Sequence, residues 1–161
     1  MRAYAAGTSV SVEKTRGEIE ALISGYGADQ FVTGWSEAEH AAMVQFKAQG
    51  RFVKITFKLP VKTEKRFTRQ PKRTWLERKP KQRDAAWDAE VRRVWRAVLL
   101  VIKSKLESVR SGIESFEQAF LPWILLPDGS TVGRAVTPLI ETAYTDGKMP
   151  KMLMLGPGSD K

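Results

Sequence analysis

The sequence predicts an α+β domain: a three-stranded antiparallel meander covered by a long helix, with a short N-terminal helix and C-terminal helices. Two observations carry this prediction. Between residues 29 and 59 apolar residues alternate with a period of two, whereas between 84 and 110 they recur with the period of an α-helix. A three-stranded sheet has to bury one of its faces, and the apolar stripe of the long helix can cover it.

The first element is a short helix, which the sequence predicts over residues 15–26. Thr15 and Glu18 are spaced as a capping box, T-x-x-E, and Gly25 and Gly27 follow where the helix would end. The apolar residues between these signals are spaced for one helix face: Ile19, Leu22, Ile23 and Tyr26.

Three strands are predicted next, over residues 29–36, 40–48 and 51–59, because each stretch is rich in aromatic and β-branched residues and the breaks between them are short. The alternation is clearest in the third stretch, in which one face is apolar: Val53, Ile55, Phe57 and Leu59. The other face of this strand is polar and partly basic, with Lys54, Thr56 and Lys58.

A strongly basic segment, residues 62–83, follows the third strand. It holds ten Lys or Arg against two Glu, and so it supplies +8 of the formal net charge of +9. Its prolines, Pro71 and Pro80, and its lack of periodicity predict a long irregular loop.

The long helix is predicted to begin with Asp84 as its cap and to end or bend at Gly112. A further helix is predicted over 113–120, and Thr131 can cap a last helix that runs through about Tyr144, with Gly147 beyond its end. Residues 1–148 are therefore interpreted as one domain and residues 149–161 as a C-terminal tail. The apolar start of that tail, "MLML" (152–155), is predicted to pack on a neighbour or on a partner.

The residue inventory favours binding over catalysis. The chain has no cysteine and one histidine, and its acidic residues are not clustered with metal-ligand spacing, so we expect no catalytic residue, no metal site and no cofactor. The third strand, "KITFK", lacks the Glu-x-Lys that a metal-dependent nuclease core would need. No apolar run is long enough to cross a bilayer, so the sequence favours a cytoplasmic protein without membrane contact.

Single-stranded nucleic acid is the partner that the basic segment predicts. Cations can neutralise phosphates, and aromatic rings between them can stack on unpaired bases, which a duplex hides. Base stacking is assigned to Phe67 and Trp75, and a secondary cationic surface to Lys54 and Lys58. The predicted phosphate contacts are Lys65, Arg66, Arg69, Lys72, Arg73, Arg78, Lys79 and Arg83. The other four tryptophans are expected to pack in the protein: Trp35, Trp87, Trp95 and Trp123.

Two resemblances agree with this interpretation. The stretches "SVSVEKTRGEIEALISGYGADQFVTGW" and "AWDAEVRRVWRAVLLVIKSKLESVRSGIESFEQAFLPWILLPDGSTVG" resemble a family of short uncharacterised proteins of phages and prophages. That resemblance implies a mobile-element setting and no particular activity. The order of helix, meander and long covering helix is similar, in pattern alone, to the core of single-strand annealing recombinases. This second resemblance implies rings or filaments that hold single-stranded DNA in a basic groove.

The hypothesis is thus a non-enzymatic, phage-type protein that binds single-stranded DNA, with annealing in recombination as its process and RNA as the alternative strand. A homo-oligomer is expected, in which residues from about 113 onward contact a neighbour. A protein-interaction module, for instance an anti-defence or regulatory factor that docks the basic loop on an acidic partner, is the main alternative. A metal-dependent nuclease is the third.

Overall fold

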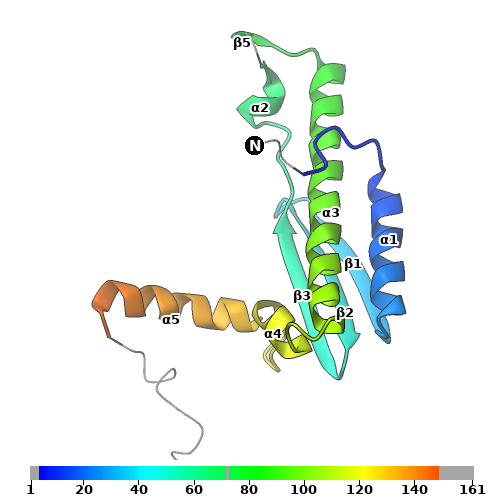
Figure 1. The fold of residues 1–161 in the computed structure, drawn as a ribbon. Coiled ribbons are helices and arrows are strands. Elements are labelled where there is room, and N and C mark those ends of the chain that lie inside the picture. Colours follow the sequence, from blue (N-terminus) through cyan, green and yellow to red (C-terminus); the bar gives the residue numbers. More distant parts are fainter. Residues whose placement is uncertain (1–3, 72, 149–161) are drawn as a thin grey trace, which may run out of the picture.

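The structure is a computed structural model that describes residues 4–71 and 73–148. It confirms the predicted α+β class and the three-stranded antiparallel meander with its long helix (Figure 1). In chain order the elements are α1 (Val12–Gly25), β1 (Gln30–Ser36), β2 (Ala41–Ala48), β3 (Arg51–Lys58), α2 (Lys65–Thr68), β4 (Arg69–Gln70), β5 (Arg73–Glu77), α3 (Pro80–Arg110), α4 (Phe116–Phe120), the 3-10 turn η1 (Leu121–Trp123) and α5 (Val132–Asp146).

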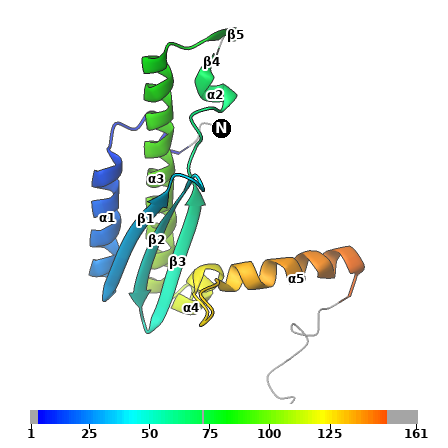
Figure 2. The same cartoon turned by 180° about the vertical axis from the view of Figure 1, so that it is seen from behind.

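The main sheet has the strand order β1-β2-β3, and each neighbouring pair is antiparallel. Helices α1 and α3 lie against one face, while Figure 2 shows the other face with no element drawn over it. The core lies between the sheet and the helices, where Val44, Phe46 and Val53 of the strands are buried together with Ile19 of α1 and Ile102 of α3. The alternation predicted for β3 is confirmed, because its even-numbered side chains are the more exposed ones.

Helix α1 begins earlier than predicted. Ser11 is the N-cap and its hydroxyl accepts a hydrogen bond from the Lys14 amide at 3.1 Å. Thr15, predicted to be the cap, is instead buried in the first turn, and its hydroxyl donates to the Ser11 carbonyl oxygen at 3.0 Å. The capping-box prediction is therefore wrong, and Glu18 forms an ion pair with Arg96 of α3 that joins the two helices.

Helix α3 also begins earlier than predicted, at Pro80. Proline suits the first turn of a helix because its fixed φ is already helical and its missing N–H would have no partner there. Asp84 is therefore not the cap, and it lies inside the helix beside Lys62 and Arg83. The apolar stripe of α3 covers the sheet as predicted, and the Trp95 ring meets Phe57 edge-on at 5.0 Å between centroids.

The C-terminal part closes one end of the core and one edge of the sheet. Ser115 caps α4, whose Phe116 and Phe120 are fully buried, and the Phe120 ring meets Phe46 of β2 at 5.6 Å. Beyond η1, Ile124 forms a bridge to Val53, which covers part of the outer edge of β3. Helix α5 then projects away from the body (Figures 1 and 2). The predicted apolar contact of the tail falls on residues 149–161, which lie outside the described residues.

Candidate nucleic-acid interface

The basic segment is a small folded unit at the N-terminal end of α3, and the predicted irregular loop is wrong. A helical turn, α2, leads into the short antiparallel hairpin of β4 and β5, in which Arg69 pairs with Glu77 and Gln70 with Arg73. Pro71 lies in the connection between the two strands, where its missing N–H costs no ladder hydrogen bond. We call residues 65–77 the basic hairpin.

Phe67 holds the basic hairpin against α3. Its side chain is only 4% exposed, so its ring has no face free for a base, and the stacking role predicted for it is wrong. The Arg66 guanidinium lies over this ring at 4.7 Å from the centroid and reaches Glu90 of α3 at 3.2 Å. An aromatic residue among cations therefore serves packing here, because α2 turns the ring inward.

Two glutamates fix the unit further. One carboxylate oxygen of Glu64 accepts a hydrogen bond from the Val61 amide at 2.6 Å, and the other accepts one from Arg66 Nε at 2.6 Å. These bonds lower the pKa of Glu64, and the bond from the Val61 backbone is the larger cause. Glu90 accepts two hydrogen bonds from Arg93, each 2.7 Å long, and these are the main reason why the pKa of Glu90 lies below its usual value. Both carboxylates therefore stay charged at neutral pH, and they hold the arginines at fixed positions.

The strand that precedes the hairpin is tied to α3 by an aromatic contact. The Trp87 indole N–H donates to the Pro60 carbonyl oxygen at 2.7 Å, and Lys62 Nζ lies over the Trp87 ring at 4.4 Å from its centroid. Trp87 is half-buried, as a packing role predicts. These contacts set where β3 passes into α2, and so they set the position of the basic hairpin.

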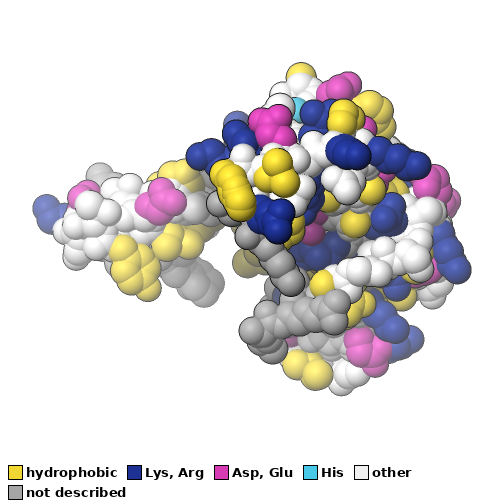
Figure 3. Space-filling view, turned by 90° about the horizontal axis from the view of Figure 1, so that it is seen from above, with side chains coloured by type: hydrophobic (Ala, Val, Ile, Leu, Met, Phe, Trp, Pro, Cys, Tyr) yellow, Lys and Arg dark blue, Asp and Glu magenta, His cyan; other side chains and the backbone are white. Residues whose placement is uncertain are grey.

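The outer side of the basic hairpin is hollowed. An open hollow of about 790 Å³ is lined by Lys65, Arg66, Arg69, Gln70, Pro71 and Trp75. The Trp75 side chain is 66% exposed, and its backbone carbonyl oxygen, rather than its ring, accepts the Arg69 guanidinium at 3.2 Å. Figure 3 looks onto this end of the molecule, where Lys and Arg side chains stand among hydrophobic ones. An exposed indole beside cations is therefore available for stacking.

The predicted phosphate contacts fall into two groups. Three of them form ion pairs with carboxylates of this chain: Arg66 with Glu64 and Glu90, Arg69 with Glu77, and Arg83 with Asp84. Within the described residues, four other predicted cations form no ion pair: Lys65, Arg73, Arg78 and Lys79. Lys72 lies outside the described residues. Exposed ion pairs are worth about 0–1 kcal/mol, so a phosphate can replace the carboxylate of an exposed pair such as Arg69–Glu77.

A smaller hollow, of about 280 Å³, lies behind the basic hairpin and brings in a residue that sequence reasoning missed. Arg93 of α3 lines it together with Arg66 and Arg78. The hydrogen bonds from Arg93 to Glu90 raise the pKa of the Arg93 guanidinium. In the sequence Arg93 is one of several basic residues off the apolar stripe of α3, and no local pattern connects it with a segment about 20 residues earlier.

The secondary cationic surface lies apart from the hollow. Lys54 and Lys58 are on the uncovered face of the sheet, and neither lines the hollow of the basic hairpin. Lys54 instead borders a shallow hollow of about 270 Å³ beside Trp35.

The packing role predicted for Trp35 is wrong, because this residue is 67% exposed. It is the last but one residue of β1, which is an edge strand. Trp95 is buried and Trp123 half-buried, as predicted.

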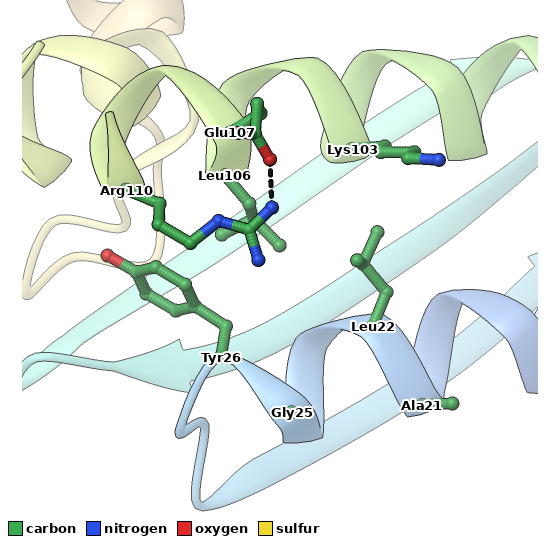
Figure 4. A pocket seen from close by; sticks show the side chains of 8 residues that line it. All are labelled: Ala21, Leu22, Gly25, Tyr26, Lys103, Leu106, Glu107 and Arg110. Atoms are coloured by element: carbon green, nitrogen blue, oxygen red, sulfur yellow. Dashed lines mark hydrogen bonds and ion pairs between the residues drawn. The ribbon is translucent and has the colours of Figure 1, made fainter. Parts of the chain in front are cut away.

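A groove also lies between α1 and α3, near the other end of α3 (Figure 4). It has a volume of about 400 Å³, and Leu22, Tyr26 and Leu106 supply its apolar walls. Arg110 points toward it and is paired with Glu107, and this pair lowers the pKa of Glu107. The groove thus combines apolar walls with a paired charge, unlike the cation-lined hollow of the basic hairpin.

Comparisons with protein-family models, curated proteins and solved structures find no match to this chain. The resemblances to a phage family and to annealing recombinases therefore stay predictions. No helix in the described part of the chain is long and apolar enough to cross a membrane. Among residues 4–71 and 73–148, no three His, Asp or Glu side chains gather as a metal site would require.

Proposed function

We propose that this protein is a non-enzymatic binder of single-stranded DNA that contacts the strand with the outer side of the basic hairpin. The observation that carries the proposal is the exposed Trp75 ring beside a hollow lined by Lys65, Arg66 and Arg69. Stacking on an aromatic ring needs an unpaired base, and the surrounding cations suit the phosphates on either side of it. Trp75 is the stacking residue of this proposal, and Phe67 is a positioning residue.

The unpaired cations set the electrostatic part of the proposal. If Lys65, Arg73 and Lys79 each meet one phosphate and Arg69 exchanges its exposed pair with Glu77 for a fourth, the logarithm of the association constant falls with the logarithm of salt concentration at a slope of about −3. Affinity then falls about 50-fold between 50 and 200 mM salt. Lys54 and Lys58 lie outside the hollow and add long-range attraction.

The experiment is a salt titration of the full chain with a fluorescently labelled single-stranded oligonucleotide, followed by anisotropy. The proposal requires binding with a slope between about −2 and −4. Absence of binding at low salt would overturn it, and a slope near zero would remove the phosphate contacts. Annealing in a phage setting is the process that we propose for this activity, and acceleration of duplex formation from complementary strands tests it separately.

An acidic protein partner is the second candidate, and one observation favours it. The basic hairpin already binds carboxylates of its own chain, since Arg66 contacts Glu64 and Glu90, and Arg69 contacts Glu77. A partner that presents Asp or Glu could use the same guanidinium groups. In that case an acidic polypeptide would compete for the basic hairpin, and loss of the Trp75 ring would change its affinity little.

A further inference from the structure

The smaller hollow behind the basic hairpin gathers three arginines from different parts of the fold. Arg66 comes from α2, Arg78 from the link between β5 and α3, and Arg93 from α3 itself. Among the described residues that line this hollow, Glu90 is the one that carries a carboxylate, so two positive charges are in excess. Glu64 pairs with Arg66 from outside the hollow, and the cations stay in excess even when it is counted. We call this space the arginine hollow.

Small side chains keep the arginine hollow open. Its lining residues from α3 share one face of the helix, because they recur at helical spacing: Ala86, Ala89, Glu90 and Arg93. The chain ahead of α1 crosses α3 toward α2 and lines the hollow from another side with Ala6 and Gly7 (Figures 1 and 2). The volume of about 280 Å³ has room for a phosphate group, since a water molecule takes only about 30 Å³ in the liquid.

Many hydrogen-bond donors of the three arginines remain available for an anion. A guanidinium group carries five N–H donors. Arg93 uses Nε and Nη2 for Glu90, and Arg66 uses Nε for Glu64 and Nη1 for Glu90. Among residues 4–71 and 73–148, the Arg78 guanidinium forms neither an ion pair nor a hydrogen bond. An anion in the hollow would therefore meet one guanidinium group with all its donors and two with part of theirs.

The arginine hollow is held in shape by contacts within the chain. Glu90 accepts hydrogen bonds from Arg66 at 3.2 Å and from Arg93 at 2.7 Å, so one carboxylate fixes two guanidinium groups. The Arg78 amide donates to the Thr68 carbonyl oxygen at 2.8 Å, which ties the backbone of Arg78 to the end of α2. Side chains that are already ordered lose less conformational freedom when a ligand binds. The hollow is thus preorganised for an anion.

A phosphate monoester is the anion that this set of groups suits. It carries close to two negative charges at neutral pH and three acceptor oxygens, and guanidinium groups bind phosphate oxygens through paired N–H donors. A phosphodiester inside a strand carries one negative charge and would leave part of the excess positive charge unbalanced. In a nucleic acid a phosphate monoester occurs only at the end of a strand.

We propose that the arginine hollow binds the terminal phosphate of a single strand that lies on the outer side of the basic hairpin. This inference rests on the proposed function and adds a preference for strand ends to it. Arg66 connects the two surfaces, because it lines both the hollow beside Trp75 and the arginine hollow. A strand whose last base stacks on Trp75 can thus pass its terminal phosphate around Arg66.

The first test compares strand ends. Unlabelled oligonucleotides of one sequence, which end in a hydroxyl, a 5′-phosphate or a 3′-phosphate, compete with a labelled strand for the full chain. At least one phosphorylated end should bind about fivefold more tightly than the hydroxyl, or better, which is the upper range for one exposed ion pair. Equal affinity of all three oligonucleotides overturns the proposal.

Arginine variants show where the phosphate binds, since a terminal phosphate adds charge that any cationic surface would attract. Arg78→Gln should reduce the gain from the phosphate to less than twofold. Arg134→Gln removes the same charge from α5, outside both hollows, and should leave the gain unchanged. A gain that survives Arg78→Gln overturns the proposal.

A second pair of variants blocks the hollow without a change to any arginine. Ala86→Glu places a carboxylate inside the hollow, whereas Ala85→Glu places one on the exposed neighbour in α3 that does not line it. Both variants change the net charge equally, so their general effect on strand binding is the same. Ala86→Glu should abolish the gain from the terminal phosphate and Ala85→Glu should keep it. Equal gains in the two variants would contradict the proposed location.

The last experiment separates this inference from the proposed function, because it needs no nucleic acid. The full chain is melted in inorganic phosphate and in chloride at equal ionic strength. Phosphate at ten times its dissociation constant should raise the melting temperature by about 3–6 °C in the native chain and in Arg134→Gln, and by less than half as much in Arg78→Gln. Equal shifts in Arg78→Gln and the native chain, or no shift, overturn the phosphate site. If the shift appears but no oligonucleotide binds, the proposed function fails and the strand end is not the ligand. If oligonucleotides bind without regard to their ends, the proposed function stands and only the present inference fails.

Discussion

Trp75→Ala is the change that tests the stacking contact. The Trp75 side chain is 66% exposed, and only its backbone carbonyl oxygen takes part in the hydrogen bond with Arg69. Its removal should therefore change the free energy of unfolding by less than about 0.5 kcal/mol. A stacked base is worth about 1–3 kcal/mol, so the affinity for single-stranded DNA should fall about 5- to 150-fold. The salt slope should stay the same because no phosphate contact is lost.

The assay is anisotropy of a labelled oligonucleotide at fixed salt, with a thermal melt of each variant to show that it is folded. Trp35→Ala is the matched control, because Trp35 is the same residue type at nearly the same exposure, 67%, but lies outside the basic hairpin. We expect Trp35→Ala to change affinity less than twofold. The reasoning is refuted if Trp75→Ala has no effect, or if the two variants lose equal affinity.

Three further outcomes follow from the same contacts. Arg73→Ala should weaken single-strand binding and make the salt slope shallower by about 0.7, which the salt titration measures, and a lower affinity at an unchanged slope would speak against a phosphate contact. Phe67→Ala should lower the melting temperature by roughly 6–12 °C, because truncation of a buried Phe costs about 3 kcal/mol or more, and an unchanged melt would mean that the hairpin is not held by this ring. The lowered pKa of Glu90, caused first by Arg93, means that its carboxylate stabilises the fold fully above the ordinary value of 4.5 and loses this effect as pH falls through the lowered folded value. Glu90→Gln should therefore melt below the native chain at neutral pH, the difference should shrink below pH 4.5, and a difference that persists in acid would contradict the assignment.

The parts of the fold that the sequence predicted are those with a long, regular pattern. The three strands were predicted within one or two residues, because alternation over seven or eight positions marks which face is buried. The last helix was predicted from Thr131, which caps it through the Arg134 amide, and from Gly147, whose φ of 64° ends it. Both signals are local, so no tertiary contact was needed to detect them.

The errors occurred where structure depends on contacts between distant residues. The basic hairpin is too short to have a period of its own, and it depends on the burial of Phe67 and on Glu90, 24 residues beyond Arg66. The location of the positive charge could be predicted, but which arginines are paired could not. The start of α3 was missed although a local signal existed, since a Pro that suits the first turn was interpreted as a loop residue.

The preference between single and double strands tests the central claim most directly. Competition for the full chain between a single-stranded oligonucleotide and a duplex of the same length, at one salt concentration, compares a partner with free base faces and a partner without them. Single-stranded DNA should bind at least about fivefold more tightly, the minimum that one stacked base supplies. Equal or tighter binding of the duplex would contradict the account, because it would leave a general cationic surface in which the Trp75 ring has no role.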